Sequence, residues 1–315
     1  MDLLQEEREA NVATLRRERV KADFLELESV ATVASGWLVD ENGSISHKAA
    51  GLRITPQGSI TYKLKEYTLR PDDVDFSDDV MLGMGAGGCV MRGIIKRTGE
   101  EVAVKTVSMD EKDKRDQLIA EIRGLVSAEG CPYLVQWYAG FASKTSHVVH
   151  VVLEYMDLGS LADLLREIRN GDIGEVPLLQ LACMARQVVE GLSFLHGRSL
   201  LHRDIKPANI LHNSQGYLKL TDFGLASFLD PGATGMTTPL VGTAQYMSPE
   251  RVLGEEYGLP SDVWSLGMVL FELATGRYPF RKCRYFIDLY VHLCEQPEPR
   301  LDAERFSPSA CDFMA

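Results

Sequence analysis

The hydrophobic and polar positions divide the chain into a strand-rich first part and a helical second part. Short apolar runs with β-branched residues fill the stretch from Val90 to Leu153, and in "EVAVKTV" Val102 and Val104 share one face of a strand. After Asp157, apolar residues recur at helical spacing in "LLQLACMARQVVEGLSFLH" and "SDVWSLGMVLFELATG". The pattern therefore predicts an α+β protein whose division falls near 153–159.

The residues before this strand-rich part differ in composition. A charge-dense stretch over 3–30 has a thin apolar stripe that predicts a helix, and alternation in "SITYKL" (59–64) predicts a short strand. The sequence "RPDDVDFSDD" (70–79) resembles an acidic linker. We therefore expect an N-terminal extension over 1–70, a β-rich domain over 71–153 and a mainly helical domain over 154–315.

Composition narrows the possible partners. The formal net charge of −12 argues against binding to nucleic acid or to an anionic membrane surface, because both favour a cationic protein. No stretch approaches the ~18 apolar residues of a membrane span. The six cysteines include no C-x-x-C pair, so neither a zinc site nor a disulfide framework is indicated. We expect a cytoplasmic protein for which access to the nucleus stays open.

A glycine cluster precedes the first long strand. The sequence "LGMGAGGCV" (82–90) places four glycines within six positions, which indicates unusual backbone angles or close approach by a group such as a phosphate. A plain hairpin explains the spacing equally well. A dinucleotide-binding fold is disfavoured, because a helix would have to open at the glycines and here a strand follows. The candidate phosphate-binding positions are Gly83, Met84, Gly85, Ala86, Gly87 and Gly88.

The most informative text is "LLHRDIKPANILHNSQGYLKLTDFGLA" (200–226). Its His-Arg-Asp at 202–204, Asn209 and Asp-Phe-Gly at 222–224 resemble the catalytic loop and metal-binding motif of protein kinases. A lone Asp or Asn would more often be a cap or turn residue. Both motifs follow the glycine cluster and "VAVK" in the expected order, however, and this makes a purely structural explanation remote. The resemblance implies a two-lobed kinase fold, with a β-rich N-lobe and a helical C-lobe.

The resemblance also assigns roles in phosphoryl transfer, where the protein mainly positions groups and neutralises phosphate charge. Asp204 is expected to accept or orient the substrate hydroxyl, and Lys206 to neutralise the γ-phosphate. Lys105 is expected to reach the α- and β-phosphates of ATP and to be held by Glu121.

Metal and adenine contacts follow in the same way. Asn209 and Asp222 supply the hard oxygen ligands that suit Mg²⁺. The resemblance further places Val90, Ala103 and Leu211 against the adenine, Leu153 as gatekeeper and the Met156 backbone as hinge contact.

Two stretches refine the resemblance. Lys206 is typical of serine/threonine kinases, and "VGTAQYMSPERV" (241–252) with "DVWSLGMVLFELATGRYPF" (262–280) is similar to mitogen-activated protein kinase kinases, the dual-specificity enzymes of three-tier cascades. In the first of these stretches, Ser-Pro-Glu at 248–250 stands where Ala-Pro-Glu is commoner among kinases. Thr221 and Ala208 depart from the usual animal sequence, which indicates a divergent member.

Two alternatives stay open at this point. Kinases one tier upstream share much of the same text. A pseudokinase or truncated scaffold would bind partners without catalysis, and the ending "FSPSACDFMA" resembles the start of a late C-lobe helix. We therefore expect an incomplete C-lobe without the arginine that usually pairs with Glu250. The retained catalytic residues favour an enzyme.

The N-terminal charged stretch carries a candidate docking segment. In "RRERVKADFLEL", Arg16 and Arg17 precede Leu25 and Leu27, which is similar to the basic-then-hydrophobic segments by which these kinases hold a downstream kinase. A solvated charged face is the competing interpretation.

The stretch between 222 and 250 carries a candidate switch. Its glycine, proline and threonine content predicts a loop, and Thr237 and Thr238 lie nearest the positions that are phosphorylated in the family. Arg203 matches the arginine that pairs with such a phosphate. We expect an upstream kinase to phosphorylate Thr237 or Thr238.

Overall fold

A computed structural model describes residues 37–40, 42–62, 65–76, 80–85, 88–143, 148–228, 244–280 and 286–314. The chain divides into two compact units: the first comprises 1–116 and 138–153, and the second 117–137 and 154–315. Several predictions concern positions outside the described residues, namely the helix over 3–30, the docking residues Arg16, Arg17, Leu25 and Leu27, the glycine-loop positions Ala86 and Gly87, and the threonines Thr237 and Thr238.

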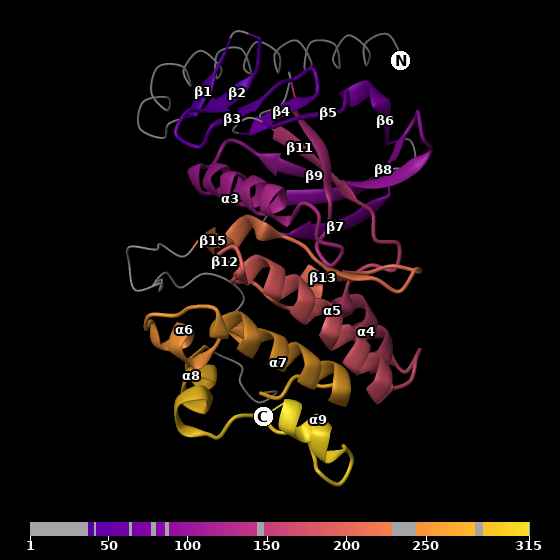
Figure 1. The fold of residues 1–315 in the computed structure, drawn as a ribbon, viewed down its shortest axis with the longest axis vertical. Helices are drawn as coiled ribbons and strands as arrows, with labels where there is room; N and C mark the ends of the chain where they lie inside the picture. The colour runs from indigo at the N-terminus through magenta and orange to yellow at the C-terminus, as the bar shows by residue number, and fades with distance from the viewer. Residues whose placement is uncertain are drawn as a thin grey trace, which may run out of the picture. The chain divides into compact units, whose positions relative to one another are not determined.

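The first unit contains a six-stranded sheet with the strand order β10-β11-β9-β8-β6 and with β7 paired to β8 (Figure 1). Val102 and Val104 are buried in its core together with Phe141 and Val152, as the alternating pattern predicts. The strands are β6 (Val74–Asp75), β7 (Met81–Gly85), β8 (Gly88–Ile95), β9 (Glu100–Ser108), β10 (Trp137–Ala142) and β11 (Val148–Glu154).

A second sheet in this unit was only partly predicted. It is an antiparallel meander in the order β1-β2-β3-β4-β5. The predicted strand corresponds to β4, and the other four strands lack a clear alternating pattern because each is only three or four residues long. The strands are β1 (Trp37–Val39), β2 (Ile45–His47), β3 (Leu52–Ile54), β4 (Ser59–Tyr62) and β5 (Lys65–Thr68).

This meander is built onto the larger sheet. The Thr55 carbonyl accepts a hydrogen bond from the Ala142 amide at the end of β10, at 3.2 Å. Ile60 is fully buried, and a Cβ at Gly140 would lie 2.4 Å from its terminal carbon. The predicted acidic linker is also partly ordered structure, because Val74 is buried and pairs with Ile95 in the sheet.

Helix α3 (Lys112–Ala128) agrees with the predicted helix, and its residues are divided between the two units. Leu118, Ile122 and Leu125 are buried on one face, and Glu121 is buried beside them with 4% exposure. The periodicity therefore identified both the helix and its buried side.

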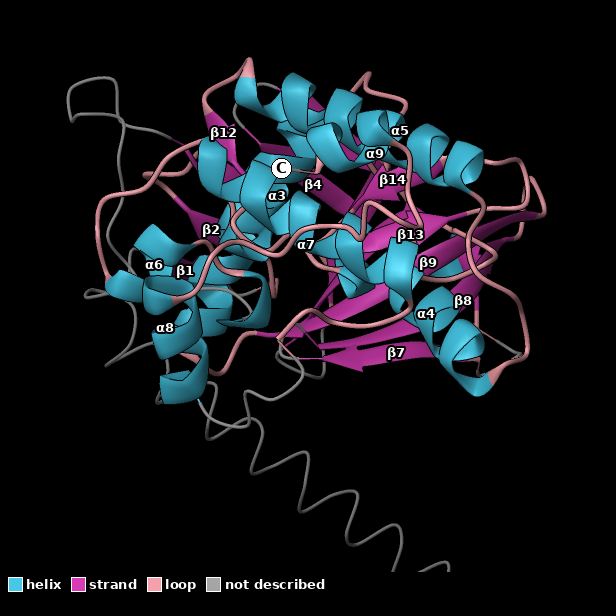
Figure 2. Ribbon diagram, turned by 90° about the horizontal axis from the view of Figure 1, so that it is seen from below, coloured by secondary structure: helices cyan, strands magenta, loops and turns pink. Residues whose placement is uncertain are grey.

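The second unit is mainly helical, with two short pairs of antiparallel strands (Figure 2). Strand β12 pairs with β15, and β13 pairs with β14. Its helices are α4 (Leu161–Asn170), α5 (Leu178–His196), α6 (Pro249–Leu253), α7 (Pro260–Thr275), α8 (Phe286–Glu295) and α9 (Pro308–Phe313). Its strands are β12 (Leu200–Leu201), β13 (Ile210–His212), β14 (Leu218–Leu220) and β15 (Ser227–Phe228), and short 3-10 turns occur at η2 (Pro207–Asn209), η3 (Phe223–Leu225) and η4 (Ala244–Tyr246), with η1 (Pro71–Asp73) in the first unit.

Among the described helices, α5 has the length and composition of a membrane span. It is nevertheless integrated into the second unit. A Cβ at Gly191 would lie 3.4 Å from side-chain atoms of Leu134 and Leu220, and His196 at the end of α5 contacts Asp262 of α7 at 2.9 Å. One face of α5, with Leu181, Val188 and Leu192, is buried in this way, whereas Leu179 is 78% exposed.

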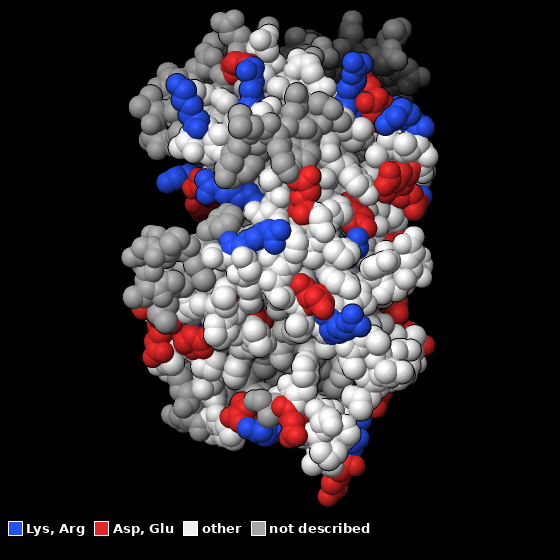
Figure 3. Space-filling model, viewed as in Figure 1, with Lys and Arg blue, Asp and Glu red and all other residues white. Residues whose placement is uncertain are grey.

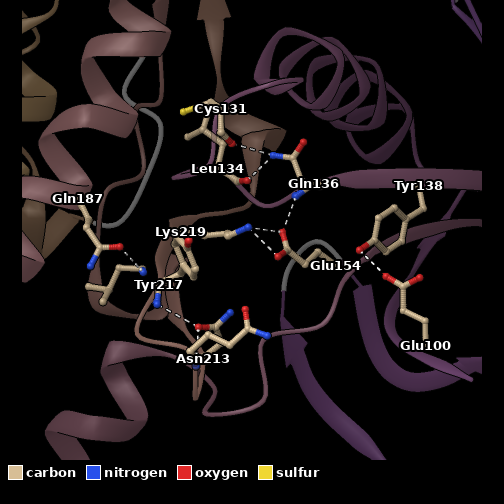
Figure 4. Close-up of polar contacts among 12 residues, drawn as sticks. Glu100, Cys131, Leu134, Gln136, Tyr138, Glu154, Gln187, Asn213, Tyr217 and Lys219 are labelled. Carbon is tan, nitrogen blue, oxygen red and sulfur yellow. Dashed lines mark hydrogen bonds and ion pairs between the residues drawn. The ribbon is translucent and has the colours of Figure 1, made fainter.

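A partly buried polar cluster lies in the second unit near the end of β11 (Figure 4). The Glu154 carboxylate accepts hydrogen bonds from Lys219 Nζ at 2.6 and 2.8 Å and from the Gln136 amide at 3.1 Å. The Gln136 side chain donates in turn to the carbonyls of Cys131 and Leu134. These bonds fix the end of β11 to β14 and to the loop after α3.

The surface in Figure 3 carries acidic and basic side chains interspersed. On that face, the described residues form no extended area of a single charge. Elsewhere in the described chain, exposed ion pairs occur, such as Arg53 with Asp40 at 3.1 Å. Exposed pairs of this kind contribute little to stability.

Candidate active site

The predicted catalytic residues of the second unit come together in one loop between β12 and β13. Asp204 is 8% exposed, and its Oδ2 accepts hydrogen bonds from Lys206 Nζ at 2.7 Å and from Asn209 Nδ2 at 2.9 Å. The Asn209 amide also donates to the Asp204 carbonyl at 2.8 Å. This carboxylate is therefore held by two side chains of its own loop.

The loop is anchored by Asp262, which lies at the start of α7. This carboxylate is completely buried and accepts hydrogen bonds from the backbone amides of His202 and Arg203, each at 2.9 Å. Burial alone raises the pKa of Asp262, but the contact with His196 and the two backbone bonds outweigh it and hold the pKa below its ordinary value. Asp262 thus stays charged and fixes the two residues before Asp204.

Arg203, the predicted phosphate-sensing residue, has a strained backbone with φ of +68°. Its guanidinium carbon lies 5.4 Å from the centre of the Tyr257 ring. The Nε atom is buried and makes no hydrogen bond within the described part of the chain. The role in phosphate sensing stays a prediction, since its partner threonines lie outside that part.

The two predicted metal ligands lie beside the β13–β14 hairpin. Ile210 pairs with Leu220, and the Thr221 amide donates to the Asn209 carbonyl at 3.0 Å, so Asn209 and Asp222 flank neighbouring strands. The amide nitrogen of Asn209 donates to the Asp204 carbonyl and to Asp204 Oδ2, so that, among the described residues, its oxygen stays available for a cation. Asp222 is partly exposed in a left-handed backbone conformation. This donor set fits Mg²⁺.

Phe223, which follows the predicted metal ligand Asp222, lies in the core. It is completely buried, and its ring centre lies 5.5 Å from that of His202. A Cβ at Gly124 of α3 would lie 2.3 Å from the Phe223 Cβ, so this glycine is needed for the helix to approach Phe223. Sequence reasoning missed Gly124, because a glycine inside a helix has no local signal of what it contacts.

The glycine-rich strand β7 belongs to the first unit and pairs with β8, with Gly83 opposite Val90 and Gly85 opposite Gly88. The fold itself requires Gly88, because its φ is +122° and a Cβ there would lie 1.8 Å from the Thr106 carbonyl oxygen. At Gly83 a Cβ would meet no atom within 4 Å. The described fold therefore leaves Gly83 unexplained, and close approach by a phosphate would explain it.

The remaining predicted nucleotide contacts lie in both units. In the first unit Val90 pairs with Lys105 across β8 and β9, and Lys105 is 7% exposed. Ala103 and Leu153 are also buried there, whereas Met156 is buried and Leu211 half-buried in the second unit. The predicted Lys105–Glu121 pair involves both units and stays a prediction.

Sequence reasoning also missed Arg251 and Asp262, which bond to the catalytic loop, and His196, which contacts Asp262. Asp262 and Arg251 lie in the two stretches, 262–280 and 241–252, that carry the family resemblance. Their contacts with 202–204 join positions about fifty to sixty residues apart. A local pattern carries no signal for such contacts.

The comparisons agree with this geometry. Residues 76–314 match the protein kinase domain family. The match covers more than half of the chain, and it includes the catalytic loop, the metal-ligand hairpin and the glycine-rich strand. The chain belongs to the protein kinase family.

Similar proteins place it more finely, among the mitogen-activated protein kinase kinases. It is 34% identical to mitogen-activated protein kinase kinase SIPKK of Nicotiana tabacum over 87% of this chain and 77% of that protein. It is 34% identical to mitogen-activated protein kinase kinase 1c of Physcomitrium patens over 89% of this chain and 82% of that protein. It is 39% identical to mitogen-activated protein kinase kinase 3 of Arabidopsis thaliana over 74% of this chain, which spans 44% of that relative. The alternatives of an upstream kinase or a scaffold are not favoured.

The extent of these matches also bears on the meander. A match over 89% of this chain is longer than residues 76–315, so it includes residues before 76. The similarity to that relative therefore extends beyond the kinase domain into the part of the chain that contains β1–β5.

Proposed function

We propose that this chain transfers a phosphoryl group from ATP to hydroxyl side chains of a downstream mitogen-activated protein kinase. The observation that carries the proposal is the buried Asp204 carboxylate held by Lys206 and Asn209. An acceptor that is fixed in this way suits orientation of a substrate hydroxyl. The names of the relatives support the choice of substrate.

Each residue of the site has a proposed task. Asp204 orients the hydroxyl and takes its proton, and Lys206, which is within reach of Asp204 Oδ2, faces the transferred group. Asn209 and Asp222 hold Mg²⁺, which supplies charge neutralisation on the phosphates when bound. Gly83 lets the backbone approach the phosphates, and Lys105 contacts them. Val90, Ala103, Leu153, Met156 and Leu211 form the adenine contacts.

We also propose two protein partners and a location. An upstream kinase phosphorylates Thr237 or Thr238, and Arg203 binds the new phosphate through charge-assisted hydrogen bonds. Arg16, Arg17, Leu25 and Leu27 hold the downstream kinase. Such a cascade operates in the cytoplasm, with access to the nucleus. Substituting both threonines with alanine is expected to prevent activation by the upstream kinase, and full activation of that variant would place the switch elsewhere.

The direct test combines ligand binding with phosphoryl transfer. Mg²⁺ with ATP is expected to raise the melting temperature, because a ligand that binds only the folded state stabilises it. The Asp222→Asn variant is expected to lose the Mg²⁺-dependent part of this shift. Transfer to a catalytically inactive mitogen-activated protein kinase, followed by mass spectrometry of the acceptor residues, measures the reaction.

The outcomes separate an enzyme from a scaffold. A nucleotide-stabilised protein that transfers phosphate supports the proposal. Stabilisation without transfer by the wild-type protein, after exposure to an upstream kinase, would indicate a scaffold. An equal thermal shift in wild type and Asp222→Asn would contradict the assignment of the metal ligand.

A further inference from the structure

Arg251 of α6 makes a buried contact to which neither the sequence analysis nor the proposed chemistry assigns a role. The side chain is 3% exposed, and its Nη2 donates a hydrogen bond to the Arg203 carbonyl at 2.9 Å. Its guanidinium carbon lies 5.1 Å from the centre of the Tyr257 ring, which the Arg203 guanidinium also contacts. A buried cation therefore reaches the peptide group that joins Arg203 to Asp204.

That peptide group is where the catalytic loop is strained. Arg203 has a positive φ, which a residue with a side chain adopts only when its surroundings impose it. On one side, Asp262 Oδ1 accepts the hydrogen bond from the Arg203 amide. On the other side, Arg251 binds the Arg203 carbonyl. Asp262 and Arg251 thus hold Arg203 at its amide and at its carbonyl. Rotation of the Arg203–Asp204 peptide group would displace Asp204 directly.

The two holding residues are themselves connected. Ser261, which precedes Asp262 in α7, donates to Glu250 Oε1 at 2.6 Å, and Glu250 precedes Arg251 in α6. Ser248 donates to the Ser261 hydroxyl at 3.1 Å. The amide and the carbonyl of Arg203 are therefore held by one hydrogen-bonded assembly of α6 and α7.

We propose that Arg251 is a positioning residue for phosphoryl transfer: it fixes the Arg203–Asp204 peptide and thereby aims the Asp204 carboxylate at the substrate hydroxyl. The inference rests on the proposed function, because it takes Asp204 as the group that meets the hydroxyl. Arg251 does not belong to the proposed nucleotide contacts, so its loss acts on kcat and not on the KM for ATP. Small displacements of a reacting group reduce rates by about 100-fold.

The test compares three variants. Arg251→Met removes the donor and keeps an apolar chain over Tyr257, and it is expected to lower kcat by about 10- to 100-fold with the KM for ATP unchanged. Arg251→Lys keeps a charged donor of similar length and is expected to recover part of this loss, as a positioning role requires. Arg169→Met is the control, because it breaks a different ion pair of the same unit, between the half-exposed Arg169 and the buried Glu272.

The readouts are kcat and the KM for ATP, counted per folded molecule from the thermal transition. The control is expected to lower the melting temperature and to keep kcat. The inference is overturned if Arg251→Met loses stability as the control does and keeps the wild-type kcat. It is also overturned if Arg251→Lys is no more active than Arg251→Met. A wild-type protein with no more transfer than Asp204→Asn would contradict the proposed function itself, and the inference would then fall with it.

Discussion

The catalytic loop and the glycine-rich strand are constructed in opposite ways. In the loop, His202 is fully buried, Asp204 is 8% exposed, and both are held by hydrogen bonds from their own loop or from α7. In the strand, Met84 is 77% exposed and Gly83 has open space at its Cβ position. The first region is completed by hydrogen bonds within its own unit, whereas at Gly83 the described residues leave the Cβ position open.

This difference shows how the two kinds of functional residue can be recognised. Residues that carry out chemistry must be held in position, so they are surrounded by hydrogen-bond partners. Residues that approach a ligand must leave space, so the fold does not explain their small size. Gly88 illustrates the contrast, because the fold accounts for it completely through its φ and the Thr106 carbonyl.

The largest effect on stability is expected from Asp262. In Asp262→Ala the amides of His202 and Arg203 lose their acceptor inside the core, and an unsatisfied buried donor costs about 1–3 kcal/mol. We therefore expect a loss of about 3 kcal/mol or more in the free energy of unfolding, measured by urea titration. The exposed Asp172 in the same unit gives the control, since Asp172→Ala is expected to change stability by less than about 0.5 kcal/mol. Equal losses in both variants would contradict the anchoring role.

A smaller but sharper effect is expected from two glycines of the predicted phosphate-binding segment, Gly83 in β7 and Gly88 at the start of β8. Gly88→Ala places a methyl group against the Thr106 carbonyl at a positive φ, and we expect a loss of about 2 kcal/mol or more. Gly83→Ala meets no neighbouring atom, and its melting temperature without nucleotide is expected to match wild type. If Gly83→Ala proves as unstable as Gly88→Ala, the fold itself requires Gly83 and the argument for a phosphate there is lost.

The smallest effect is the acid sensitivity of the loop anchor. The pKa of Asp262 lies below its ordinary value of 3.8 in the folded protein, so folding favours the charged form. Its contribution to stability is therefore complete above pH 3.8 and is lost as the pH falls from 3.8 through the lower folded value. Acid unfolding followed by circular dichroism is expected to show a weaker pH dependence below 3.8 in Asp262→Asn than in wild type. An identical slope would show that the Asp262 pKa is not coupled to folding.

Much of the fold could be predicted from the sequence, for physical reasons that differ between elements. Helix α3 and strands β8 and β9 are long and periodic, so the spacing of their apolar residues predicts which side is buried. The meander β1–β5 was mostly missed, because strands of three residues contain too few positions to show an alternation. Strand β6 was not predicted, because the sequence around Val74 is acidic. Val74 pairs with Ile95 of β8, about twenty residues later in the chain.

The site shows a similar division. Asp204, Asn209 and Asp222 lie in short motifs whose residue types are dictated by chemistry, and the structure brings Asp204 and Asn209 into contact. Asp262, Arg251 and Gly124 act through contacts with residues far away in the sequence. Their identities follow from packing and from hydrogen bonds that only the folded chain defines.

The measurement that tests this account most directly is a steady-state comparison of Asp204→Asn and Gly83→Ala in transfer of phosphate from ATP to an inactive mitogen-activated protein kinase. We expect Asp204→Asn to lower kcat by about 10²–10⁴-fold with the KM for ATP nearly unchanged, because it removes the group that meets the hydroxyl. Gly83→Ala is expected to raise the KM for ATP by about tenfold with a smaller change in kcat, because its methyl group obstructs the phosphates. The account is contradicted if Asp204→Asn retains wild-type kcat, or if Gly83→Ala leaves the KM for ATP unchanged.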